Sequence, residues 1–169
     1  ECARAYSLSR QDYDLGMVKY EAAVLIAALK SETAKTIIIT SEDLSGHMPG
    51  RHKLHGYGAA PHLMRALSET FKAASPEDEL TFFFTTRSAE PWLRSCYAQN
   101  VRAGRMVWDE SDYMKRLKAS ADHDQTLDLI KKEVADHALI DAALEEYATR
   151  PLGMAEALLD HLEMDAKGR

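Results

Sequence analysis

The chain has 169 residues, of which 46% are hydrophobic and 28% are charged, as in an ordinary globular protein. Its net charge of −6 argues against a general nucleic-acid-binding protein, which would be basic. The longest apolar run, Ala22–Leu29, is too short to span a bilayer, and residues 1–10 lack the apolar core of a secretory signal. The two cysteines, Cys96 on a predicted helix and Cys2 at a frayed terminus, do not form a disulfide scaffold, so a cytoplasmic location is expected.

Helical and extended patterns alternate along the chain. Two short runs, Thr36–Thr40 and Leu80–Phe84, predict strands buried on both faces. The segment His137–Tyr147 stays open: its composition favours a helix, but it could also hold a third strand around Leu139–Leu144. Apolar residues at helical spacing predict the helices Tyr13–Leu29, Pro61–Ala74, Ala89–Ala103, Asp109–Ala119, Asp124–Asp136 and Leu152–Leu162.

This alternation predicts a single α/β domain. We expect three layers, with a small parallel sheet flanked by helices and a helix-rich carboxyl-terminal half. The alternative is a helical interaction domain in which both predicted strands are buried helix turns.

Arg87 and Ser95 are spaced for phosphate binding. The predicted strand Leu80–Phe84 leads to Arg87, and Ser95 follows eight residues later on the next predicted helix. Ligands of open α/β sheets bind at the carboxyl ends of the strands. A guanidinium there and a hydroxyl about two helical turns further on can hold a phosphate between them. The alternative is an arginine on a rim and a serine on an unrelated helix face.

The stretch that follows the first predicted strand is rich in glycine and histidine and should be a loop, Ser41–Ala59. Its first carboxylate, Glu42, could act as a general base or could merely cap the next turn. Residues 44–68 contain no Asp or Glu but hold four of the seven histidines together with Arg51, Lys53 and Arg65, which predicts a local positive potential. A mobile solvated loop is one alternative. A zinc site is another, disfavoured because neither cysteine lies nearby.

Two stretches resemble bacterial sulfotransferase-like proteins of the P-loop superfamily. They are TIIITSEDLSG at Thr36–Gly46 and FFFTTRSAEPWLRSCYAQ at Phe82–Gln99, and a weaker match covers Leu144–Leu162. Sulfotransferases hold the 3′-phosphate of the sulfuryl donor PAPS with an arginine after a strand and a serine eight residues later. The resemblance therefore implies that Arg87 and Ser95 bind this phosphate, with Tyr97 close by.

The activity implied by the resemblance is PAPS-dependent transfer of a sulfuryl group to a hydroxyl or amine of a carbohydrate or small molecule. Glu42 is the expected base and His47 the second candidate, while Arg51 and Lys53 would contact an anionic acceptor. No metal, nucleic acid or membrane is required. The family's lysine-bearing phosphate loop is missing from these residues, so we expect a domain incomplete at its amino terminus. The alternative is a nucleotide- or polyanion-binding module without catalysis.

Overall fold

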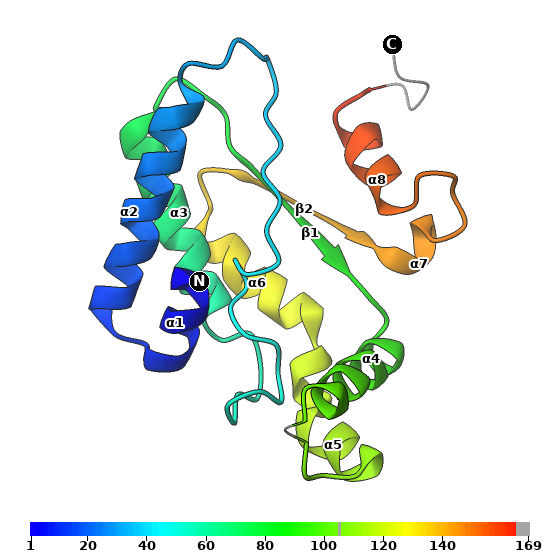
Figure 1. The fold of residues 1–169 in the computed structure, drawn as a ribbon. Helices are drawn as coiled ribbons and strands as arrows, with labels where there is room; N and C mark the ends of the chain where they lie inside the picture. The colour runs from blue at the N-terminus through cyan, green and yellow to red at the C-terminus, as the bar shows by residue number, and fades with distance from the viewer. Residues whose placement is uncertain (105, 165–169) are drawn as a thin grey trace.

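Two parallel strands form the only sheet in the described part of the computed structural model, which covers residues 1–104 and 106–164. They are β1 (Thr81–Thr86) and β2 (Ala138–Ala143), paired in a register that sets Phe82 beside Leu139. Parallel strands need a crossover connection, and α4, α5 and α6 make it here (Figure 1). The predicted α/β fold with a small parallel sheet flanked by helices is confirmed, and the open segment around Leu139 is a strand.

The predicted helices are confirmed with small shifts at their ends. One helix, α1, was not predicted. The expected frayed terminus at Cys2 is wrong, since Cys2 begins this helix, is half-buried and packs against the core. The helices are α1 (Cys2–Ser9), α2 (Asp12–Leu29), α3 (Ala60–Ala74), α4 (Ala89–Arg102), α5 (Glu110–Leu117), α6 (His123–Glu133), α7 (Leu144–Tyr147) and α8 (Met154–His161), with a 3-10 helix at Lys118–Ala121.

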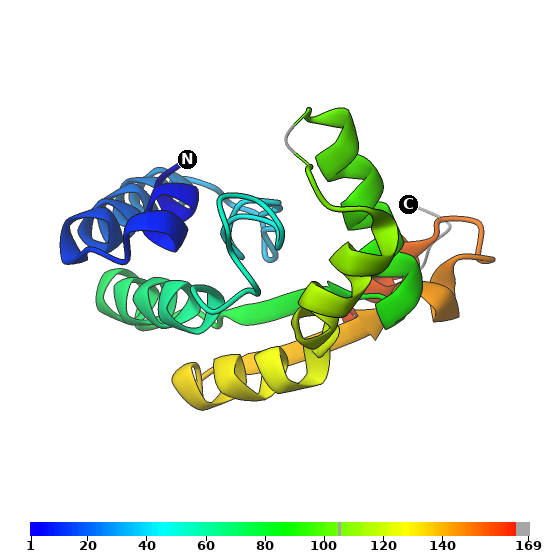
Figure 2. The same ribbon diagram turned by 90° about the horizontal axis from the view of Figure 1, so that it is seen from below.

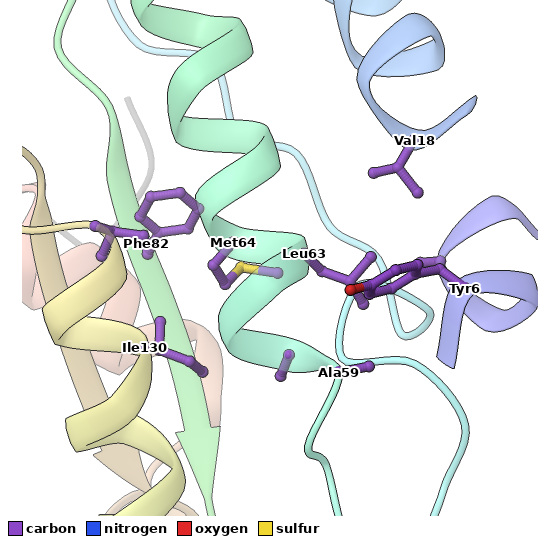
Figure 3. Close-up of a cluster of buried hydrophobic side chains, with 10 residues drawn as sticks. Tyr6, Val18, Ala59, Leu63, Met64, Phe82 and Ile130 are labelled. Atoms are coloured by element: carbon purple, nitrogen blue, oxygen red, sulfur yellow. The ribbon is translucent and has the colours of Figure 1, made fainter. Parts of the chain in front are cut away.

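The core has two parts. The larger one joins α1, α2, α3, β1 and α6, and Figure 3 shows Leu63 and Met64 of α3 between Tyr6 on one side and Phe82 and Ile130 on the other. The smaller one joins α4, α5 and the 3-10 helix through Leu93, Cys96, Tyr113, Leu117 and Ala121. Figures 1 and 2 show the connection between α2 and α3 lying between these two groups of helices.

The predicted strand at Thr36–Thr40 is wrong. All five residues are exposed and belong to neither a helix nor a strand, and Ile37, Ile38 and Ile39 are 42%, 51% and 54% exposed. Their β-branched side chains favour an extended backbone, but a strand also needs a neighbour to pair with. Within the described residues, no backbone hydrogen bond joins this isoleucine segment (residues 36–40) to another element. The segment therefore does not bring the following loop to an edge of the sheet.

None of the helices that the structure describes is long and apolar enough to cross a membrane.

Candidate functional site

A cavity of about 410 Å³ lies where the connection between α2 and α3 meets α1 and α4. Three of the residues predicted to carry chemistry, Glu42, His47 and Arg51, line it together. We call residues 41–59 the pocket loop, as they provide most of the lining. The full lining is Arg4 of α1, Glu42, Ser45, Gly46, His47, Met48, Arg51 and Tyr57 of the pocket loop, and Gln99 of α4.

Helix α1 holds the first part of the pocket loop. The backbone N–H of His47 donates to Ser7 Oγ at 3.1 Å, and this hydroxyl in turn donates to the Arg4 carbonyl at 2.8 Å. Gly46 has φ of +85°, and a Cβ at this position would lie 2.7 Å from Ser7 Cβ. Only glycine permits both this backbone conformation and such a close approach to α1.

Helices α4 and α5 hold the middle of the pocket loop through a buried polar cluster. The Pro49 carbonyl accepts hydrogen bonds from Tyr113 Oη at 3.1 Å and Asn100 Nδ2 at 3.3 Å, and Asn100 also donates to Tyr113 Oη at 3.0 Å. Tyr113 is 0% exposed and Asn100 is 2% exposed. Buried polar groups with their partners in place fix a single backbone path, so the loop is ordered although it has no regular secondary structure.

The charges that act on His47 in the cavity are mostly positive. Burial lowers the pKa of His47 below its usual 6.5, and the nearby charges of His52, Arg4 and Arg51 lower it further. Asp43 opposes this effect on the His47 pKa and pairs with Arg4 at 2.6 Å. Without a ligand His47 is therefore held neutral at neutral pH, beside two permanent cations.

Two buried nitrogens of residues that line the cavity lack a hydrogen-bond partner among the described residues. His47 Nδ1 and Arg51 Nε are buried, and neither has a hydrogen-bond partner among the residues that the structure describes. Buried polar atoms are nearly always paired, and a donor on a guanidinium is especially costly to leave alone. An anion with several oxygen acceptors, such as a phosphate or sulfate group, would satisfy Arg51 and complement the surrounding charge. Glu42 is exposed and lines the same cavity, which places a carboxylate in the cavity wall.

Arg87 lies in the turn between β1 and α4, as predicted, but it does not line the cavity. Its charge acts on the buried thiol of Cys96, where burial raises the pKa to about 11 and Arg87 and Arg51 both oppose the rise. Ser95 precedes this cysteine on α4, and Gln99, one turn after Ser95, lines the cavity. Neither of the two predicted phosphate-binding residues lines the cavity.

A carboxylate already occupies the start of α4. Glu145 of α7 accepts a hydrogen bond from the backbone N–H of Ser88 at 2.9 Å. This bond lowers the pKa of Glu145, and the charge of Arg87 adds a smaller effect in the same direction. A phosphate at Arg87 would have to share this position with Glu145 or displace it.

Two further predicted residues point elsewhere. Tyr97 packs against Tyr113, with ring centroids 5.3 Å apart, and its hydroxyl donates to the Trp108 carbonyl at 3.4 Å. Lys53 is exposed at a turn with φ of +63° and is not part of the cavity lining. The structure gives Tyr97 a packing role and leaves Lys53 at the surface.

Arg4 and Gln99 were missed from the sequence. Arg4 belongs to the unpredicted helix α1, whose buried residues Ala3, Tyr6 and Ser7 have the helical spacing that could have revealed it. Gln99 has no sequence signal, since only the packing of α4 beside the pocket loop brings it to the cavity.

Among residues 1–104 and 106–164, no group of three or more His, Cys, Asp or Glu side chains is arranged to hold a metal ion. In comparisons with known proteins, no family model, no curated protein and no solved structure matches the chain.

Proposed function

We propose that this chain binds a phosphate- or sulfate-bearing ligand between the pocket loop and α4. As a sulfotransferase-like protein, it would transfer a sulfuryl group from PAPS to a hydroxyl or amine acceptor. The cavity that joins Arg4, His47 and Arg51 carries the proposal, because it brings two guanidinium groups close to His47 and has buried nitrogens that lack partners. The resemblance around Arg87 and Ser95 supplies the identity of the donor.

In this proposal each region has one task. Arg87 and Ser95 bind the 3′-phosphate of the donor, and Arg51 and His47 hold an anionic group in the cavity. PAPS supplies the sulfuryl group and leaves as adenosine 3′,5′-bisphosphate. The acceptor oxygen or nitrogen forms a bond to sulfur while the sulfur–oxygen bond to the leaving phosphate breaks. Glu42 takes the proton that the acceptor loses, and the cations stabilise charge on the leaving group.

Calorimetric titration of adenosine 3′,5′-bisphosphate tests the donor site. We expect Arg87→Ala and Ser95→Ala each to weaken binding, the arginine change by about tenfold or more, because it removes a charge-assisted hydrogen bond. Arg102→Ala, at the exposed end of the same helix, is the control and should leave the affinity unchanged. Glu145→Gln should strengthen binding, because it removes the carboxylate beside Arg87. Equal binding by wild type and Arg87→Ala, or none by either, would refute this assignment.

Inorganic sulfate tests the cavity separately. Arg51→Gln should weaken sulfate binding about tenfold or more, since it removes the charge next to the ligand, whereas Lys53→Gln should have little effect. Equal losses in both variants would mean that sulfate responds only to the general positive potential of the loop. Sulfate binding that Arg51→Gln leaves intact would place the anion elsewhere.

Turnover tests the role of Glu42. With PAPS and a panel of hydroxyl and amine acceptors, Glu42→Gln should keep the affinity for adenosine 3′,5′-bisphosphate and lose about 10²-fold to 10⁴-fold in rate. Unchanged turnover would exclude Glu42 as the base, and lost binding would make its role structural.

A second candidate function is a nucleotide- or polyanion-binding module without catalysis. The absence of a lysine-bearing phosphate loop from these 169 residues favours it. This candidate predicts that the chain binds adenosine 3′,5′-bisphosphate or a sulfated polymer such as heparin, and that no acceptor is sulfated.

A further inference from the structure

The isoleucine segment is a strand-forming sequence without a partner in the structure. All five residues are exposed, and in a strand their neighbouring side chains would point to opposite sides, so isoleucines would face outward on both sides. In the described part of the chain its backbone makes no hydrogen bond to another element. An exposed, apolar segment with unpaired backbone groups and strong strand propensity is a template for pairing with another strand.

The surface around this part of the chain is also unusually apolar. Of thirteen large apolar side chains that are exposed among the described residues, eight lie between residues 8 and 39. Helix α2 contributes several, because its apolar residues occur on all sides and only Val18 and Ala22 are buried. This part of the chain therefore exposes more large apolar side chains than the rest of the described residues do. The eight are Leu8, Tyr13, Tyr20, Val24, Leu25, Ile37, Ile38 and Ile39.

The sequence of the isoleucine segment suits pairing with a second copy of itself. TIIIT reads the same in both directions, so an antiparallel pair centred on Ile38 sets each residue opposite an identical one. Thr36 would face Thr40 of the other copy, and Ile37 would face Ile39. A two-fold interface requires this self-complementarity, and β-branched cross-strand pairs stabilise such a ribbon.

The flanking charges agree with the same arrangement. Lys35 precedes the segment, whereas Glu42 and Asp43 follow it closely. In an antiparallel pair the amino-terminal flank of one strand lies beside the carboxyl-terminal flank of the other. Lys35 of each copy would then lie next to the acidic pair of the other copy, whereas a parallel pair would set like charges side by side.

We propose that two copies of this chain associate through residues 36–40, which pair as an antiparallel two-stranded ribbon with its two-fold axis at Ile38. The pairing gives each segment the backbone partners that it lacks and shields part of its isoleucine surface. This inference is independent of the proposed ligand and reaction.

Single cysteines test the register, in a Cys2→Ser background that keeps the buried Cys96. Directly opposite residues in an antiparallel pair have Cα atoms about 4.5 to 5.5 Å apart, within disulfide range, whereas diagonal ones are about 7 to 8 Å apart. Ile38→Cys should therefore form a disulfide-linked dimer on mild oxidation. Ile37→Cys alone should not, but an equal mixture of Ile37→Cys and Ile39→Cys chains should.

Val107→Cys is the collision control, since Val107 is 90% exposed and far from the segment in the sequence. The proposal fails if Ile38→Cys links no better than Val107→Cys. It also fails if Ile37→Cys alone links as well as Ile38→Cys, because a parallel or shifted pairing would then hold.

Sedimentation measures the association without cross-linking. Wild type should show a concentration-dependent dimer, and Ile38→Lys should weaken it by about tenfold or more, because the two lysines would face each other. Val107→Lys should sediment as wild type. Circular dichroism checks that both variants keep their helices. A monomeric wild type at the highest concentration reached, or an unchanged dimer in Ile38→Lys, would overturn the proposal and leave the segment for another partner.

Discussion

Two neighbouring parts of the connection between α2 and α3 lack regular structure, but they are held very differently. The isoleucine segment is exposed along its whole length and bonded to no element within the described residues. The pocket loop is fixed at three places: by Ser7, by Tyr113 with Asn100, and by Arg10, which donates to the Gly58 carbonyl at 2.7 Å. Polar partners on the neighbouring helices, rather than apolar composition, decide which part is anchored to the rest of the molecule.

The largest effect on stability should come from Tyr113, whose hydroxyl donates to the Pro49 carbonyl of the pocket loop. Tyr113 is 0% exposed, so Tyr113→Ala should lower the free energy of unfolding by about 3 to 5 kcal/mol and weaken sulfate binding as the loop loosens. Tyr113→Phe removes only the hydroxyl, and Asn100 still bonds to Pro49, so it should cost about 1 kcal/mol. Urea denaturation measures both. A cost below 1 kcal/mol for the alanine variant would contradict this role.

Alanine substitutions at two glycines should change the free energy of unfolding in opposite directions. Gly50 has φ of +87°, and a Cβ there would lie 2.8 Å from the Tyr113 ring, so Gly50→Ala should destabilise the protein by about 1 to 3 kcal/mol. Gly16 lies within α2 with nothing within 4 Å of its added Cβ, so Gly16→Ala should stabilise by about 0.5 to 1 kcal/mol. If thermal denaturation gave the same sign for both, the pocket loop would not be held against α5 as described.

Stability should depend on pH through His47. Its pKa is lowered in the folded state, so below its usual 6.5 the unfolded chain binds a proton that the folded chain resists. The free energy of unfolding should therefore fall as pH drops below about 6.5, and His47→Gln should reduce this slope. A bound sulfate favours the charged imidazole, so the stabilisation by sulfate should grow over the same pH range.

His123 provides the control for this pH effect. Burial lowers its pKa as well, so His123→Gln should also reduce the slope. It lies outside the cavity lining, however, and should leave the pH dependence of sulfate stabilisation intact. If His47→Gln retained that dependence, the anion would not contact His47.

The smallest effect on stability should come from a substitution in the isoleucine segment. Ile38→Ala, measured at low protein concentration where monomers dominate, should change the free energy of unfolding by no more than about 0.5 kcal/mol, because the side chain is exposed. A loss of about 2 kcal/mol or more would instead show that the segment is buried in the monomer.

The sequence predicted those elements best whose side-chain pattern matches their burial. Helix α3 has its apolar residues on one face and packs that face into the core, and the phenylalanine run of β1 includes the buried Phe82. The composition of β2, with four of its six residues Ala or Leu, did not distinguish strand from helix, and only its pairing with β1 decided it. The strand prediction for the isoleucine segment was wrong for the converse reason. Its side chains favour a strand, but within the described residues no other strand pairs with it.

The site was predictable only in part. The lack of acidic residues in the stretch 44–68 predicted a cationic loop. Glu42, His47 and Arg51 do line one cavity. The contributions of Arg4 and Gln99 depend on the packing of α1 and α4 around that loop, which local sequence patterns do not encode.

The position of Glu1 has a practical consequence for handling this protein. Its amino group lies 3.8 Å from the carboxylate of Asp43, which pairs with Arg4 at the wall of the cavity. Residues joined in front of Glu1 would therefore pass close to the cavity and would be expected to hinder access to it. Helix α8 lies well away from α1 (Figure 1), so a tag attached on the α8 side of the molecule is the better choice for ligand measurements.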